Sequence, residues 1–209
     1  MIEIKGLTKK YGNRTLFDKA NYIFDDNEFI AIYGASGSGK STLLNIIGLL
    51  DDFDSGIVSI NGVENVGIHS KKAMMMRRHE ISYLFQSFAL IDEKKVRDNL
   101  MIALEYTNLS KNEKLERIMS VLSEVNLSDK LDNYVYELSG GEQQRIAMAR
   151  VKLQDTKIIL ADEPTGSLDD KNKRNIIDML LKEKAKGKTI IIATHDKDIR
   201  EISTQVIEL

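Results

Sequence analysis

A glycine-rich segment between an apolar strand and a helix constrains the fold of this chain more than any other feature. Residues 34–41 read Gly-Ala-Ser-Gly-Ser-Gly-Lys-Ser, after the apolar run Phe29–Tyr33 and before a helical pattern over residues 40–49. Glycines let successive backbone N–H groups turn toward a phosphate, and the following helix presents its positive end to the same anion. The spacing G-x-x-x-x-G-K-[ST] therefore predicts a nucleotide-phosphate site rather than an ordinary glycine-rich helix cap.

Single residues of this segment have predicted roles. Lys40 supplies a compact positive charge for the β- and γ-phosphates, and the Ser41 hydroxyl is placed to bind Mg²⁺. Thr42 can donate to a nearer phosphate. The predicted phosphate-binding residues are Gly34, Ala35, Ser36, Gly37, Ser38, Gly39, Lys40, Ser41 and Thr42.

Two adjacent acids end a second apolar strand, residues 157–162. Neighbouring side chains on a strand point to opposite faces, so Asp162 and Glu163 are expected to differ in role. Asp162 fits a Mg²⁺ ligand, directly or through water, and Glu163 fits a general base or a positioning group for an attacking water. A polar strand end entering a turn would explain the pair equally well if no phosphate loop preceded it.

Short apolar runs alternate with helical patterns along the whole chain. Strands are predicted at residues 1–5, 15–24, 29–33, 56–60, 81–85, 157–162, 188–194 and 205–209, and helices at 40–49, within 93–126, from 139 and at 171–186. Within 93–126, one buried helix face is predicted from Leu115, Ile118, Met119, Leu122 and Val125. Strands that alternate with helices indicate a mostly parallel sheet covered on both faces. We expect a single α/β domain of the P-loop NTPase class, with an N-terminal antiparallel β part and an inserted α-helical subdomain over about 87–156. The core would then comprise residues 1–86 and 157–209.

The segment Leu138–Arg145 reads Leu-Ser-Gly-Gly-Glu-Gln-Gln-Arg. Ser139 and Glu142 have the spacing of a capping box for the helix that follows. A cap does not explain Gly140 and Gly141, since glycine at a helix start disfavours the helix unless a close approach requires it. The two glycines instead suggest a second phosphate site at a helix terminus.

With these motifs in order along essentially its whole length, the chain resembles the ATP-binding subunits of ABC transporters. The resemblance implies that two copies pair head to tail. Each ATP, with Mg²⁺, would lie between the phosphate loop of one copy and Ser139, Gly140 and Gly141 of the other. It also implies an ATPase in which Glu163 acts on the attacking water.

The same resemblance assigns roles to single residues. It implies that Tyr11 stacks on adenine, and that Gln86 senses Mg²⁺ and water and links to the helical subdomain. His195 would contact the γ-phosphate, and Ser167-Leu168-Asp169 would cross the dimer interface. Each of these residues taken alone is more often structural, so their order and spacing support the assignment.

Residues 161–169 are similar to the MacB/LolD branch of these ATPases, and the departure at Ala89–Glu93 from the usual Leu-Pro-rich stretch resembles ATPases associated with bacteriocin export. The branch implies a separate transmembrane permease that exports a peptide, lipoprotein or antimicrobial. A soluble ABC ATPase acting on the ribosome or nucleic acid is the alternative, although such proteins usually carry Asn-His where this chain has Gly166-Ser167.

The resemblance implies a cytoplasmic protein held at the inner face of the membrane by its permease, and the composition is compatible with this. The chain has 30 basic and 32 acidic side chains, a formal net charge of -2 and no cysteine. The near-equal charges argue against a surface that wraps nucleic acid. The absence of cysteine excludes disulfides. Neither a signal peptide nor a run of about 20 apolar residues is evident, so direct membrane insertion is not expected.

Overall fold

A five-stranded parallel sheet forms the centre of the molecule. We describe residues 1–166 and 168–209 of a computed structural model. The strand order is β6-β7-β8-β3-β9, with β3 at Phe29–Tyr33, β6 at Ile81–Leu84, β7 at Ile158–Asp162, β8 at Thr189–Thr194 and β9 at Gln205–Glu208. Because both faces of this sheet are covered, its inner strands are apolar throughout rather than alternating. This explains why continuous apolar runs predicted β3, β7 and β8.

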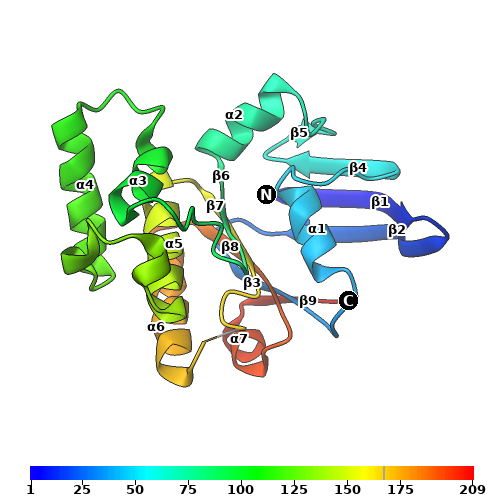
Figure 1. Ribbon diagram of the computed structural model, residues 1–209. Helices are drawn as coiled ribbons and strands as arrows, with labels where there is room; N and C mark the ends of the chain where they lie inside the picture. Colours follow the sequence, from blue (N-terminus) through cyan, green and yellow to red (C-terminus); the bar gives the residue numbers. More distant parts are fainter. Residues whose placement is uncertain (167) are drawn as a thin grey trace.

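A second, antiparallel sheet lies beside the first. Its order is β2-β1-β4-β5, with β1 at Ile2–Tyr11, β2 at Arg14–Phe24, β4 at Ser55–Ile60 and β5 at Val63–Glu64. The β1–β2 hairpin turns at Gly12-Asn13, so Tyr11 pairs with Arg14 at its tip. In Figure 1 helix α1, Lys40–Ile47, lies between the two sheets.

The remaining helices complete the layers around the parallel sheet. They are α2 (Lys71–His79), α3 (Val96–Met101), α4 (Lys111–Glu124), α5 (Gly140–Gln154), α6 (Asp170–Ala185) and α7 (Lys197–Ile202), with short 3₁₀ turns at Ile102–Leu104, Ser128–Lys130 and Val135–Glu137. Figure 1 shows α3 to α6 on the side of the sheet opposite α1. In the chain, α3 to α5 lie between β6 and β7, which are neighbours in the sheet. The α/β fold with an antiparallel part and a helical insertion is confirmed.

Strand alternation divides the core into two hydrophobic clusters. Phe29, Ile190 and Ile192 pack with the helices α3 to α6, whereas Ile30 and Ile191 pack with α1 and the antiparallel sheet. Successive side chains on a strand face opposite ways, so one apolar strand serves both clusters. The strand β3, which leads into the phosphate loop, is thereby packed on both faces of the sheet.

For the helices, the predictions differ from the structure in two respects. Helices α2 and α7 were not predicted, because each is short and buries only one or two residues, Ala73 and Met76 in α2 and Ile199 in α7. The predicted apolar face of α4 is narrower than expected. Ile118, Leu122 and the following Val125 are fully buried, but Leu115 and Met119 remain more than a third exposed.

A buried ionic cluster joins α5, α6 and β8. The Glu183 side chain, 1% exposed, lies 2.8 Å from the Nζ atoms of both Lys186 and Lys188 and 3.5 Å from Lys152 Nζ. Burial alone would raise the pKa of Glu183, but the hydrogen bonds and charges of Lys186 and Lys188 hold that pKa below its usual value. The ionised carboxylate therefore stabilises the fold.

We expect Glu183→Gln to lower the free energy of unfolding by about 1 to 3 kcal/mol, because it removes a buried carboxylate from Lys188 and Lys152. The two lysines keep Asp155 and Glu124 as partners. Since the folded-state pKa of Glu183 is depressed, its contribution is complete above the ordinary glutamate range and is lost as the pH falls through the folded value. Urea unfolding between pH 3 and 7 measures this, with the exposed Asp178→Asn on the same helix as control. Equal losses in both variants would contradict the assignment.

Among the residues described, none of the helices combines the length and the apolar character that a membrane crossing requires.

Candidate nucleotide-binding site

The loop between β3 and α1 has the backbone conformation that its glycines allow. Gly39 precedes the first residue of α1 at φ 108°, and a Cβ atom there would lie 2.9 Å from the Phe17 ring. At Gly34 a Cβ atom would lie 2.5 Å from the carbonyl oxygen of Leu209. Neither position accepts a side chain, so the loop folds tightly against β2 and β9 and leaves the first N–H groups of α1 directed at the cleft.

Lys40 places a positive charge at the floor of this loop. Its Nζ donates to the carbonyl oxygens of Gly34 at 2.9 Å and Ala35 at 3.0 Å, and its side chain is only 7% exposed. The same atom lies 3.8 Å from Glu163 Oε1. Among the described residues, Ser38 Oγ is buried without a hydrogen-bond partner. A buried cation and an unpartnered hydroxyl in one loop fit a polyphosphate, which would accept from both.

Ser41 and Asp162 place two oxygen atoms, each a possible metal ligand, next to each other at the floor of the cleft. Ser41 Oγ donates to Asp162 Oδ1 at 2.8 Å. Burial raises the pKa of Asp162, the Ser41 hydrogen bond opposes this, and the charge of Glu163 adds to the rise. Within the described residues there is no group of three or more His, Cys, Asp or Glu side chains placed to hold a metal. One hydroxyl and one carboxylate nevertheless fit Mg²⁺, which commonly takes its other ligands from water and substrate phosphates.

Glu163 turns toward the cleft because the backbone leaves the strand conformation. Strand β7 ends at Asp162, and Glu163 has φ 42° while its N–H donates to the Ala193 carbonyl at 2.9 Å. The expectation that the two acids lie on opposite faces of a strand therefore does not apply. Glu163 Oε1 lies 2.8 Å from His195 Nδ1, and the carboxylate is 13% exposed. The pair is placed to orient a water molecule or accept its proton.

A single cleft of about 750 Å³ collects most of the predicted residues. The predicted residues that line it are Tyr11, Ala35, Ser36, Gly37, Gly39, Lys40, Ser41, Thr42, Gln86, Glu163 and His195. Gly34 and Ser38 lie in the same loop, and Asp162 reaches it through Ser41. Sequence reasoning missed Gly166, Leu16 and Arg14, whose Nη2 donates to the Gly37 carbonyl at 3.0 Å. The position of Arg14 opposite Tyr11 in the hairpin is the signal that could have found it.

The glycine-rich helix start lies apart from this cleft. Ser139 and Glu142 form the expected capping box at the start of α5. A Cβ atom at Gly141 would lie 2.7 Å from Asn172 Nδ2 of α6, so close helix packing accounts for that glycine. Nothing among the described residues lies within 4 Å of a Cβ atom at Gly140. Ser139, Gly140 and Gly141 are not among the described residues that line the cleft.

Leu168 and Asp169 of the predicted interface segment do not line the cleft either. Asp169 caps α6, since its Oδ1 accepts from the Asn172 N–H at 2.8 Å. It borders a separate polar groove with Arg145 and Asn172. Ser167 lies outside the described residues.

This site and the sheet that carries it define a P-loop nucleotide-binding domain. Residues 17–166 match the sequence profile of the ABC transporter family. The chain belongs to that family and is an ABC-type ATPase domain.

Curated relatives and solved structures agree with this assignment. The chain is 37% identical over 214 residues to the macrolide export ATP-binding/permease protein MacB of Nitrosomonas europaea, and 35% identical over 209 residues to MacB of Campylobacter jejuni NCTC 11168. These matches cover 100% of this chain but only 32% and 33% of those proteins, so the chain spans about a third of their length.

Two solved cassettes have the same fold. The dimeric structure of MJ0796, a bacterial ABC transporter cassette, has a TM-score of 0.92 at 35% identity and covers 100% of this chain and 94% of that one. CbiO1 from Clostridium perfringens, part of the transporter complex cbiONQ, has a TM-score of 0.82 at 28% identity and covers 95% and 79% of the respective chains. A second MJ0796 structure is a dimeric post-hydrolysis state bound to ADP and Pi.

Proposed function

We propose that this chain binds and hydrolyses ATP as one half of a two-cassette dimer, and that the dimer drives a membrane permease. One observation carries the proposal. The cleft gathers the phosphate loop with Glu163 and His195, while Ser139 and Gly140 lie elsewhere, and no described residue comes within 4 Å of a Cβ atom at Gly140. A second copy could bring its own Ser139–Gly141 helix start to this cleft, as the dimeric state of the similar MJ0796 cassette supports.

The residues of the cleft divide the chemistry among them. Lys40 and the N–H groups at the start of α1 hold the β- and γ-phosphates, and Tyr11 stacks on adenine. Ser41, Asp162 and Gln86 would hold Mg²⁺, which would supply positive charge to neutralise the phosphates. Glu163 orients the attacking water and accepts its proton. His195, the hydrogen-bond partner of Glu163, contacts the γ-phosphate. Gly140 and its neighbours supply the second set of phosphate donors from the partner copy.

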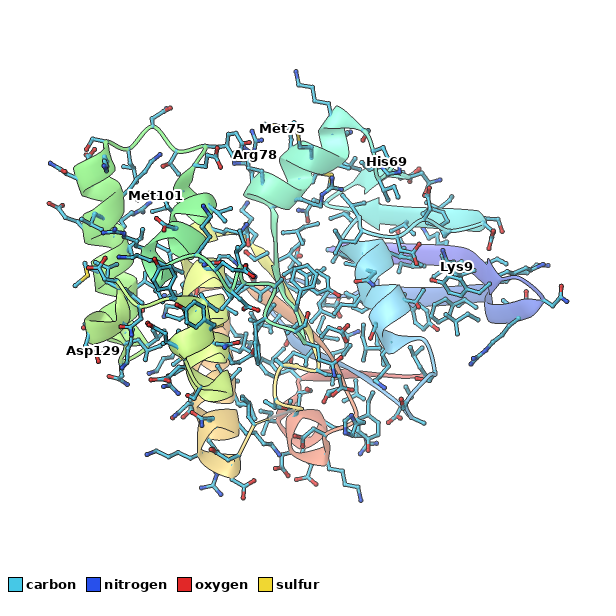
Figure 2. The ribbon with its side chains drawn as sticks, viewed as in Figure 1. Lys9, His69, Met75, Arg78, Met101 and Asp129 are labelled. Atoms are coloured by element: carbon cyan, nitrogen blue, oxygen red, sulfur yellow. The ribbon has the colours of Figure 1, made fainter. Side chains whose placement is uncertain are left out.

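Exposed apolar side chains support a membrane-protein partner. Met74 and Met75 of α2 and Ile102 and Tyr106 near α3 are all more than a third exposed. The Arg78 guanidinium of α2 lies 3.3 Å from the centre of the Tyr106 ring, so the exposed residues of α2 and those near α3 are in contact. Figure 2 shows Met75, Arg78 and Met101 at the same end of the molecule. This surface would take a permease segment and hold the cassette at the inner face of the membrane.

Export is the transport direction that the relatives favour. The MacB proteins are named for macrolide export, and they combine ATP-binding and permease functions in their names. We infer that the substrate of this system is an antimicrobial, peptide or lipoprotein that leaves the cell.

The dimer requirement makes turnover depend on chain concentration. Because each complete site needs two copies, we expect the rate per chain at saturating ATP and Mg²⁺ to fall about tenfold on tenfold dilution below the dimer dissociation constant. A phosphate-release assay over a dilution series measures this. A rate per chain that stays constant down to nanomolar concentrations, with no dimer present by light scattering, would rule out the shared site.

A further inference from the structure

Tyr11 is the exposed end of a small network of polar side chains. Its ring lines the cleft at the end of β1 and is 50% exposed. Its hydroxyl donates to Asp51 Oδ2 at 2.6 Å, and Lys9 Nζ lies 4.7 Å from the ring centre. Lys9 Nζ also donates to Asp51 Oδ1 at 2.9 Å and to the Asp52 carbonyl at 2.6 Å. The ring is therefore held at its hydroxyl and on one face.

The network is anchored at the C-terminal end of α1. The Lys9 side chain is 10% exposed, and Figure 2 shows this residue on β1 beside α1. Asp51 follows the C-terminal end of α1, where its N–H and that of Leu50 donate to the Asn45 carbonyl. Helix α1 begins at Lys40, so the residue that holds the Tyr11 hydroxyl is fixed to the same helix that carries the phosphate site.

The charges of the network favour one ring position. Burial alone would raise the pKa of Asp51, but the hydrogen bonds from Tyr11 and Lys9 and the Lys9 charge hold that pKa below its usual value. The carboxylate stays ionised and accepts strongly from the phenol. The Lys9 ammonium covers one face of the ring, which leaves the opposite face for a flat ligand.

We propose that Asp51 and Lys9 are positioning residues for the nucleotide base, because they hold the Tyr11 ring as a fixed platform for stacking. An exposed tyrosine at a hairpin tip would otherwise move among rotamers, and binding would have to order it. The network removes that cost before the nucleotide arrives. This proposal rests on the proposed contact between Tyr11 and adenine.

Calorimetric titration with ADP, and competition by inorganic tripolyphosphate, separate base binding from phosphate binding. We expect Tyr11→Phe and Asp51→Asn each to weaken ADP about threefold to fivefold, with no change for tripolyphosphate, which has no base. The double variant should be no weaker than the weaker of the two single variants, since Tyr11→Phe removes and Asp51→Asn weakens the same hydrogen bond. Asp52→Asn removes the same charge one residue away and leaves the carbonyl that Lys9 contacts, so it should bind ADP as the unaltered chain does.

The substitution Tyr11→Ala distinguishes a failure of the stacking contact from a failure of the positioning proposal. If Tyr11→Ala leaves ADP affinity unchanged, the ring does not meet the base and that part of the proposed function is wrong. If Tyr11→Ala weakens ADP while Tyr11→Phe and Asp51→Asn do not, stacking holds and the positioning proposal is overturned. An equal loss of tripolyphosphate affinity in Asp51→Asn would also overturn it, because Asp51 would then act on α1. Tyr11→Phe changes one exposed atom and keeps the test valid should Asp51→Asn unfold.

Discussion

Glu163→Gln is expected to lower the rate of ATP hydrolysis by a factor of about 10² to 10⁴, the usual contribution of a positioned general base. The substitution keeps the shape of the side chain and removes its charge. Glu163 Oε1 lies 2.8 Å from His195 Nδ1 and 3.8 Å from Lys40 Nζ, so both neighbours lose a carboxylate partner that a carboxamide replaces only in part. ATP binding should persist, because the phosphate loop is untouched and a negative charge near the γ-phosphate is gone.

The measurable consequence is an ATP-bound dimer that no longer opens. On size exclusion with ATP, the Glu163→Gln chain should elute as a dimer while the unaltered chain is largely monomeric. Glu201→Gln, an exposed position on α7, makes the same chemical change away from the cleft and should behave as the unaltered chain. A Glu163→Gln chain that binds ATP tightly yet stays monomeric is incompatible with closure of two copies around the nucleotide.

The apolar strands could be predicted because covering both faces of a parallel sheet demands uninterrupted hydrophobic runs. Residues 29–33, 157–162 and 188–194 satisfied that demand, and β3, β7 and β8 lie there within a residue of each predicted end. Helix α2 escaped prediction for the opposite reason. Only Ala73 and Met76 are buried, so it shows no stripe of helical periodicity, and its Ser70 cap was the one available sign.

The phosphate loop could be predicted with its residues because its chemistry is local. A turn, a helix start and one lysine lie within eight positions, so spacing alone describes them. Glu163 shows where local reasoning ends. Strand alternation does not describe its direction, since Glu163 lies beyond the end of β7 at φ 42° and its N–H donates to the carbonyl of Ala193, a residue thirty positions away on β8.

The same limit applies to the two glycines at the start of α5. Their composition suggested one shared reason, a close approach by a phosphate. The structure separates them, because Gly141 packs against Asn172 of α6 and Gly140 does not. Only the fold shows that contact, and it leaves Gly140 as the position whose small size the described residues do not require.

Gly140→Leu tests what approaches that position from outside the chain. A Cβ atom there meets no described residue within 4 Å, and leucine favours a helix more than glycine does. The substitution should therefore keep or slightly raise the melting temperature, and it should leave ADP binding to the cleft unchanged. If the partner's helix start completes the site, the added side chain blocks its approach to the γ-phosphate. Turnover should then fall about 100-fold, the effect expected when phosphate-stabilising donors are displaced.

The matched control is Gly67→Leu. Gly67 is another exposed glycine with open space around a Cβ atom, and it lies far from α5 in the sequence. It should keep full turnover. Mixing Gly140→Leu with Glu163→Gln adds a sharper test, because each mixed dimer contains one site with both defects and one site with neither. Turnover should then partly recover, to at most half that of the unaltered dimer, only if each site takes its cleft from one copy and its helix start from the other. Unchanged turnover in Gly140→Leu alone, or no recovery on mixing when mixed dimers are shown to form, would mean that ATP is cleaved without the second copy's glycines.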